Sequence, residues 1–211
     1  MDYIEEFFKV RNNKVAFLRR LFDSSHQDEA MTLCCVYIDG LGQAIYFPDK
    51  RSSFNFVRAL REHGEQPYLD LVYPTGLVRW VKAWEKRKEA KHPEFGGLST
   101  KVDSALASLK GQLVSEADLR RALSQGLSVN DFQIVSPELW HGTLAYVAYK
   151  RLRISFVHTL HGYSGVLFGQ TTYNGQPVPE IDFSMLHGAL ESVIRYAYKI
   201  SVESGKLFGY G

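Results

Sequence analysis

Apolar residues recur every three or four positions along several long segments of this chain, and this spacing constrains the fold more than any other feature. Between residues 3 and 23 this spacing indicates an amphipathic helix, with the apolar residues Ile4, Phe7, Phe8, Val15, Phe17, Leu18, Leu21 and Phe22. The same criterion predicts helices at about 30–47, 52–63, 75–89, 99–113, 115–125, 136–160 and 184–204. Because strand signals are almost absent, we expect an all-α fold, an up-and-down helical bundle.

The composition is that of a chain with a real core. Of the 211 residues, 45% are hydrophobic and 13% aromatic, which argues against disorder. The length suits a single domain, 1–211, with a sizeable insertion. The net charge of +2 argues against a general nucleic-acid coat, although it leaves room for a local basic cleft.

The two cysteines, Cys34 and Cys35, are adjacent in an apolar run. We interpret them as small core side chains in a reducing, cytoplasmic setting, because no disulfide framework can be built from them. No apolar run reaches the roughly 18 residues that a membrane-spanning helix needs, so we expect no membrane partner.

Two stretches differ from the long helices. Residues 92–135 have few aromatic side chains and two short helical patterns, and we interpret them as an insertion, because such a length is marginal for an independent core. Residues 163–182 contain several glycines and prolines. There Asn174-Gly175 favours a short hairpin over an irregular loop before the last helix.

Arg153 and His158 stand five residues apart late in the predicted 136–160 helix, which is apolar on nearly every side. A buried arginine is costly unless it is paired, and histidine gains or loses a proton near neutral pH. The two groups could therefore hold a phosphate and move a proton beside it. A structural role stays open: the arginine would satisfy helix carbonyls or a carboxylate such as Asp39, and the histidine would cap the helix.

Other arginine–histidine pairs have similar spacing, among them Arg151 and His158. Arg58 and His63 lie on the predicted 52–63 helix, and we interpret that pair as surface charge on a solvated face. Arg20 and His26 straddle a helix end. Short spacings of this kind arise by chance. The residues around each pair therefore have to decide which pair is a candidate site.

The late pair resembles the signature of the HEPN superfamily, whose members are small helical bundles with an arginine, a polar residue, three more residues and a histidine near the end of a late helix. Arg153 and His158 match the two defining positions at the commonest spacing. Similarity to small bacterial members extends over three further segments, 32–42, 51–63 and 135–139. It omits 92–135 and the 163–182 loop.

The resemblance implies metal-independent cleavage of RNA by a homodimer, in which two protomers bring their arginines and histidines together in a cleft. His158 would accept the proton of the RNA 2′-hydroxyl or donate one to the leaving 5′-oxygen, giving a 2′,3′-cyclic phosphate. Arg153 would stabilise the charge growing on the phosphate. Lys150, Ser155 and His161 are candidate helpers. An antitoxin or other partner protein, and a role in toxin–antitoxin pairing or defence, rest on the same family analogy alone.

A metal site is the next alternative. His158 and His161 form a His-x-x-His pair that would share one face of a continuing helix. However, Gly162 indicates that the helix is ending, no acid of the His-Glu-x-x-His type intervenes, and no third ligand is evident. We therefore expect neither a metal nor a cofactor.

A binding protein that does not cleave RNA is the alternative to an enzyme. The family usually has Asn, Asp or His directly after the arginine, whereas this chain has Ile154. That difference favours a dimeric helical module that binds nucleotide, RNA or a partner protein.

Overall fold

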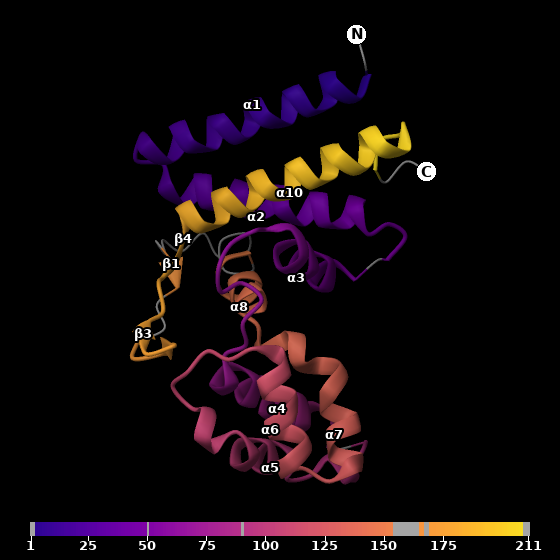
Figure 1. The fold of residues 1–211 in the computed structure, drawn as a ribbon, viewed down its shortest axis with the longest axis vertical. Coiled ribbons are helices and arrows are strands. Elements are labelled where there is room, and N and C mark those ends of the chain that lie inside the picture. Colours follow the sequence, from indigo (N-terminus) through magenta and orange to yellow (C-terminus); the bar gives the residue numbers. More distant parts are fainter. Residues whose placement is uncertain (1–2, 50, 90, 154–164, 167–168, 209–211) are drawn as a thin grey trace. The chain divides into compact units, whose positions relative to one another are not determined.

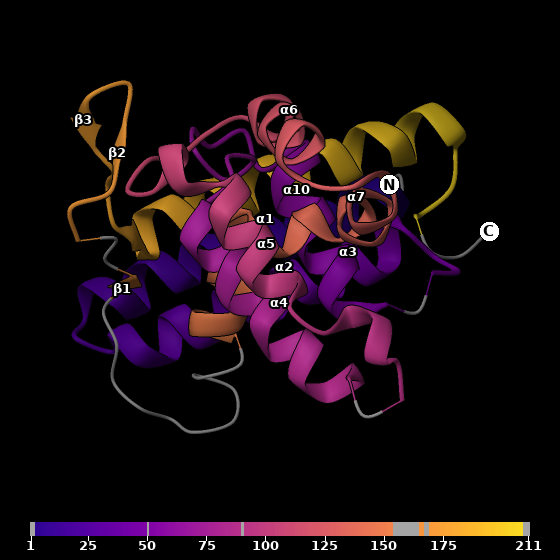
Figure 2. The same ribbon diagram turned by 90° about the horizontal axis from the view of Figure 1, so that it is seen from below.

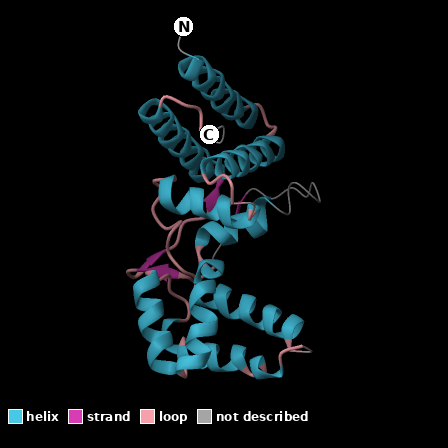
Figure 3. Cartoon of the chain, turned by 90° about the vertical axis from the view of Figure 1, so that its right-hand side faces the viewer, coloured by secondary structure: helices cyan, strands magenta, loops and turns pink. Residues whose placement is uncertain are grey.

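The computed structural model describes residues 3–49, 51–89, 91–153, 165–166 and 169–208. Most of these residues are helical, and the strands among them are short (Figure 3). The predicted all-α fold is therefore confirmed. The chain divides into two compact units: unit 1 is Met1–Leu69, Ala148–Leu167 and Glu180–Gly211, and unit 2 is Asp70–Val147 and Phe168–Pro179.

Unit 1 is a helical bundle. Its helices α1 (Tyr3–Asp23), α2 (Gln27–Ile45) and α10 (Phe183–Ser204) lie side by side (Figure 1) and pack on one another, and α3 (Ser52–His63) packs on α2 and α10. Fully buried side chains from all four helices form the core, among them Leu18, Ile38, Phe56 and Leu190. The spacing that predicted these helices is thus the spacing of their buried faces.

Local signals set the ends of the last helix. A short antiparallel pair, β1 (Gly165–Val166) and β4 (Ile181–Asp182), precedes it. The Asp182 side chain then accepts a hydrogen bond from the Met185 backbone N–H at 2.9 Å and caps α10. Gly205 ends the helix in the left-handed conformation, with φ of +66°.

Both cysteines are buried and free of disulfides, as predicted. Cys34 and Cys35 lie on the buried side of α2, and both have 0% of their surface exposed. Burial, and after it the neighbouring Cys35, raises the pKa of the Cys34 thiol well above its ordinary value. Cys34 therefore behaves as a small apolar side chain.

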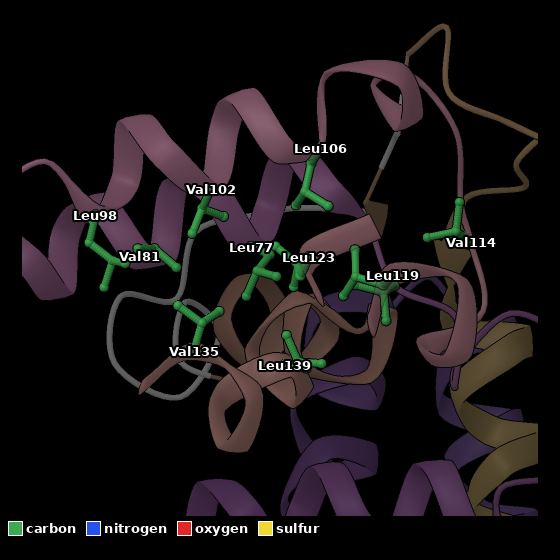
Figure 4. Close-up of a cluster of buried hydrophobic side chains, with 11 residues drawn as sticks. Leu77, Val81, Leu98, Val102, Leu106, Val114, Leu119, Leu123, Val135 and Leu139 are labelled. Carbon is green, nitrogen blue, oxygen red and sulfur yellow. The ribbon is translucent and has the colours of Figure 1, made fainter. Parts of the chain in front are cut away.

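Unit 2 is a second set of helices with its own core. Its helices are α4 (Pro74–Lys88), α5 (Leu98–Ala105), α6 (Glu116–Gly126), α7 (Val129–Val135) and α8 (Leu144–Ala148), whose last residue belongs to unit 1. It also has 3-10 turns at Pro93–Phe95, Ala107–Leu109 and Ser136–Gly142. Figure 4 shows the buried cluster between them, to which α4, α5 and α6 contribute residues including Leu77, Val102, Leu119 and Leu123.

The second unit begins earlier in the sequence than the insertion expected at 92–135. It starts at Asp70, because Leu77 and Val81 of α4 share one buried cluster with the helices that follow. The change of composition at residue 92 therefore falls inside a packed unit. A single domain over 1–211 stays a prediction.

The hairpin predicted within 163–182 is confirmed in its described part. Strands β2 (Thr172–Tyr173) and β3 (Gln176–Pro177) pair antiparallel in unit 2 (Figure 2). The turn residues Asn174 and Gly175 both have positive φ, at +50° and +77°. This is the backbone that a two-residue hairpin turn requires and that Asn-Gly adopts readily.

The continuous helix predicted over 136–160 is wrong in its described part. The 3-10 turn Ser136–Gly142 is followed by Thr143 in extended conformation, by the short α8 and by a π-helical turn at Tyr149–Arg153. Residues 154–160 lie outside the described residues.

Backbone pairing within unit 2 explains the break. The Leu144 N–H donates to the Leu71 carbonyl at 2.9 Å, and the Tyr73 N–H donates to the Gly142 carbonyl at 2.8 Å. Gly142 also packs closely: a Cβ there would lie 2.8 Å from Cγ1 of Val72. Hydrogen bonds to a distant segment replace the bonds that would have continued the helix, and helical periodicity alone could not reveal this.

Among the helices within the described ranges, none combines the length and the apolar character needed to cross a membrane.

Candidate functional site

The predicted catalytic pair lies at the edge of what the structure describes. Arg153 is the last residue of the π-helical turn Tyr149–Arg153, and Lys150 is exposed on the same turn. The other predicted site residues, Ser155, His158 and His161, lie outside the described residues. The pairing of Arg153 with His158 therefore stays a prediction.

The turn that leads to this pair is firmly anchored in unit 1. Leu152 has 0% of its surface exposed, and the Tyr149 ring packs on Phe56 of α3, with 5.4 Å between ring centroids. Lys150 and Arg151 point to solvent on the same turn. π-Helical turns recur at functional positions. This turn leads into the segment that contains His158, and its exposed Lys150 and Arg151 carry positive charge.

Asp39, the carboxylate considered as a structural partner for Arg153, takes part in a polar network between α2 and α3. It accepts a hydrogen bond from the Ser52 hydroxyl at 3.0 Å and lies half-buried. In the same network the Asn55 amide donates to the backbone carbonyl of Asp49 at 2.7 Å and to Oε1 of Gln43 at 3.3 Å. These bonds fix α3 on α2 in unit 1.

Another arginine–histidine pair with a five-residue separation, Arg58 and His63, lies within the described residues. The Arg58 guanidinium donates to the Glu62 carboxylate at 2.8 Å and lies over the Tyr46 ring, 4.1 Å from its centroid. The Tyr46 hydroxyl donates to the same carboxylate at 3.0 Å. His63 stacks on Tyr196 of α10, with 3.4 Å between centroids and 10° between planes.

This arrangement corrects the interpretation of the pair as surface charge. It holds for Arg58, whose side chain is 41% exposed, but His63 is only 13% exposed. The difference arises because Tyr196, far away in the sequence, covers one face of the imidazole. We call Tyr46, Arg58, Glu62, His63 and Tyr196 the His63 cluster.

The charges of the His63 cluster act on its histidine in opposite directions. Burial, the largest influence, lowers the pKa of His63; the Glu62 carboxylate raises it, and the Arg58 guanidinium lowers it. Burial and then Glu62 raise the pKa of Tyr46. Nε2 of His63 is buried, has no hydrogen-bond partner within the described part of the chain and lies 3.8 Å from Glu62. The cluster therefore disfavours the protonated imidazole and leaves Nε2 of His63 without a hydrogen bond among the described residues.

A metal has no evident place in the part of the chain that the structure covers. Within those ranges no three side chains of the types His, Cys, Asp and Glu gather into a metal-binding group. His158 and His161 lie outside those ranges.

Comparisons with protein-family models, with curated proteins and with solved structures returned no match to this chain.

Proposed function

We propose that this protein is a metal-independent endoribonuclease in which Arg153 binds the scissile phosphate and His158 transfers the proton. RNA carries its own nucleophile, the 2′-hydroxyl, so a base, an acid and a positive charge suffice for cleavage. The products would be a 2′,3′-cyclic phosphate and a free 5′-hydroxyl. As in the HEPN proteins that the motif resembles, two protomers would form the cleft.

The observation that carries the proposal is the anchored turn at Tyr149–Arg153. Its buried Leu152 and packed Tyr149 hold the backbone in place, and its exposed Lys150 and Arg151 offer positive charge for the RNA backbone. The all-α bundle is compatible with the motif's usual setting. To position a phosphate, the backbone that carries Arg153 must be held in place and positive charge must lie nearby, and this turn meets both requirements.

The test is cleavage of a mixed-sequence RNA by the purified full chain in excess EDTA. We expect wild-type protein to produce fragments that end in 2′,3′-cyclic phosphate, detected by mass spectrometry. Arg153→Ala and His158→Ala should each lower the rate about 100-fold or more, the scale of general acid–base catalysis.

The matched control replaces an arginine and a histidine of similar spacing elsewhere. Arg20 and His26 are both exposed on unit 1, so Arg20→Ala/His26→Ala should cut RNA at the wild-type rate. Intact RNA with wild-type protein would contradict the proposal. The proposal would also be contradicted if Arg58→Ala and His63→Phe lost cleavage while Arg153→Ala kept full activity. That result would place the catalytic residues in the His63 cluster.

A second function is favoured by Ile154, which replaces the usual polar residue after the arginine. In that case the protein would be a dimeric module that binds RNA, nucleotide or a partner protein through Lys150 and Arg151. A band shift with intact RNA, abolished by Lys150→Ala/Arg151→Ala, would distinguish binding from cleavage. Light scattering should give a mass about twice the 24.0 kDa of one chain under either proposal.

A further inference from the structure

A pocket of about 330 Å³ lies within unit 1, where α1, α2 and α10 meet the C-terminal segment at Phe208. Its volume falls in the range of about 300–1,000 Å³ in which proteins hold small molecules. The walls are largely aliphatic and aromatic and include Phe7, Tyr37 and Phe208. Phe7 and Phe208 are in edge-to-face contact, with 6.1 Å between their centroids.

The charged side chains that line the pocket are all positive. The two charged residues that line it, Arg11 and Lys14, are both cationic and sit one turn apart on α1. Each lies over an aromatic ring of the same pocket: the Arg11 guanidinium is 4.7 Å from the centroid of Phe7, and the Lys14 ammonium is 5.7 Å from that of Tyr37. Neither forms an ion pair with any residue in the described ranges.

Uncompensated cations beside an apolar hollow favour an anion. The rings and aliphatic walls exclude water on one side, which strengthens the attraction of the two positive groups for a negative one. A carboxylate or phosphate could bridge both cations, because arginine and lysine present several N–H donors each. The adjacent rings would then pack on an aromatic body.

Gly40 keeps one wall of the pocket open. It lies in the middle of α2 on the same face as Tyr37 and Ala44, and a Cβ built there would meet nothing within 4 Å. Glycine inside a helix is less favourable than alanine. The pocket is therefore open at Gly40, although a larger and more helix-stabilising side chain would fit there.

We propose that this pocket binds a small aromatic anion, with its acidic group on Arg11 and Lys14 and its ring between the α1 and α2 walls. The site belongs to α1, α2 and α10 and does not depend on the ribonuclease proposal. It gives unit 1 a ligand site that the Arg153–His158 motif does not use.

The test is calorimetric titration of the full chain with naphthalene-2-carboxylate, compared with the neutral naphthalene-2-carboxamide. We expect the carboxylate to bind at least about tenfold more tightly than the amide, because only the carboxylate carries a negative charge that pairs with the two cations. Arg11→Gln/Lys14→Gln should remove that preference. Gly40→Trp should abolish binding by filling the pocket, and thermal unfolding would verify that this variant is folded.

Two control variants isolate the site. Gly40→Ala should bind the carboxylate within about threefold of wild type, because one methyl group occupies little of the space. Arg19→Gln removes an α1 cation that pairs with Asp23 outside the pocket and should leave affinity unchanged. Equal affinity for carboxylate and amide, undiminished binding by folded Gly40→Trp, or an effect of Arg19→Gln as large as that of the double variant would overturn the proposal.

Discussion

At the scale of single residues, His63 shows how the same side chain changes character with its surroundings. On an exposed helix face it would titrate near its ordinary pKa of 6.5. Stacked on Tyr196 and largely buried, it keeps a lowered pKa despite the Glu62 carboxylate 3.8 Å away. Arg58 pairs with that carboxylate, which offsets part of its effect on the imidazole.

The lowered pKa of His63 predicts a pH-dependent loss of stability. In the unfolded chain the imidazole takes up a proton near its ordinary pKa, whereas the folded protein resists protonation. The contribution of His63 is therefore complete above about pH 6.5 and is lost as the pH falls from there through the folded-state pKa.

Thermal unfolding of wild type and His63→Phe, followed from pH 7.5 to 5, measures this effect. Phenylalanine keeps the stack on Tyr196 but has no proton to gain. We expect the Tm of His63→Phe to rise relative to wild type as the pH falls. Parallel Tm curves would mean that His63 titrates alike in the folded and unfolded chains.

At the scale of elements, two glycines of α2 differ in the room that their neighbours leave. A Cβ on Gly42 would lie 2.7 Å from the Asn55 backbone carbonyl oxygen of α3, whereas one on Gly40 meets nothing within 4 Å. The close approach of α2 and α3 thus depends on Gly42, because the backbone of α3 cannot move aside without breaking its packing.

The two glycines provide a matched pair of substitutions in one helix. Gly42→Ala should destabilise the protein by about 1–3 kcal/mol, the usual cost of overpacking. Gly40→Ala should stabilise it by about 0.5–1 kcal/mol through helix propensity. Urea denaturation measures both. The same sign for both variants would contradict the close packing of α2 on α3.

At the scale of the whole molecule, each unit has its own buried cluster, and we expect their stabilities to be separable. Leu123 of unit 2 and Leu190 of unit 1 both have 0% of their surface exposed. Truncation of either to alanine should cost about 2–5 kcal/mol. Hydrogen exchange should accelerate in α4, α5 and α6 for Leu123→Ala, and in α1, α2 and α10 for Leu190→Ala. Equal acceleration in both units by either variant would show one cooperative core.

The sequence by itself determined the all-α class, the buried cysteines and the Asn174-Gly175 hairpin, because apolar spacing and turn chemistry act between residues close in the chain. It also singled out Arg153 and His158, whose pairing stays a prediction. Only the tertiary structure decided the break at Thr143, the start of unit 2 at Asp70 and the burial of His63. Each depends on a contact with a segment far away in the sequence, such as Leu71 bonding to Leu144 or Tyr196 covering an imidazole. Local patterns contain no information about such partners.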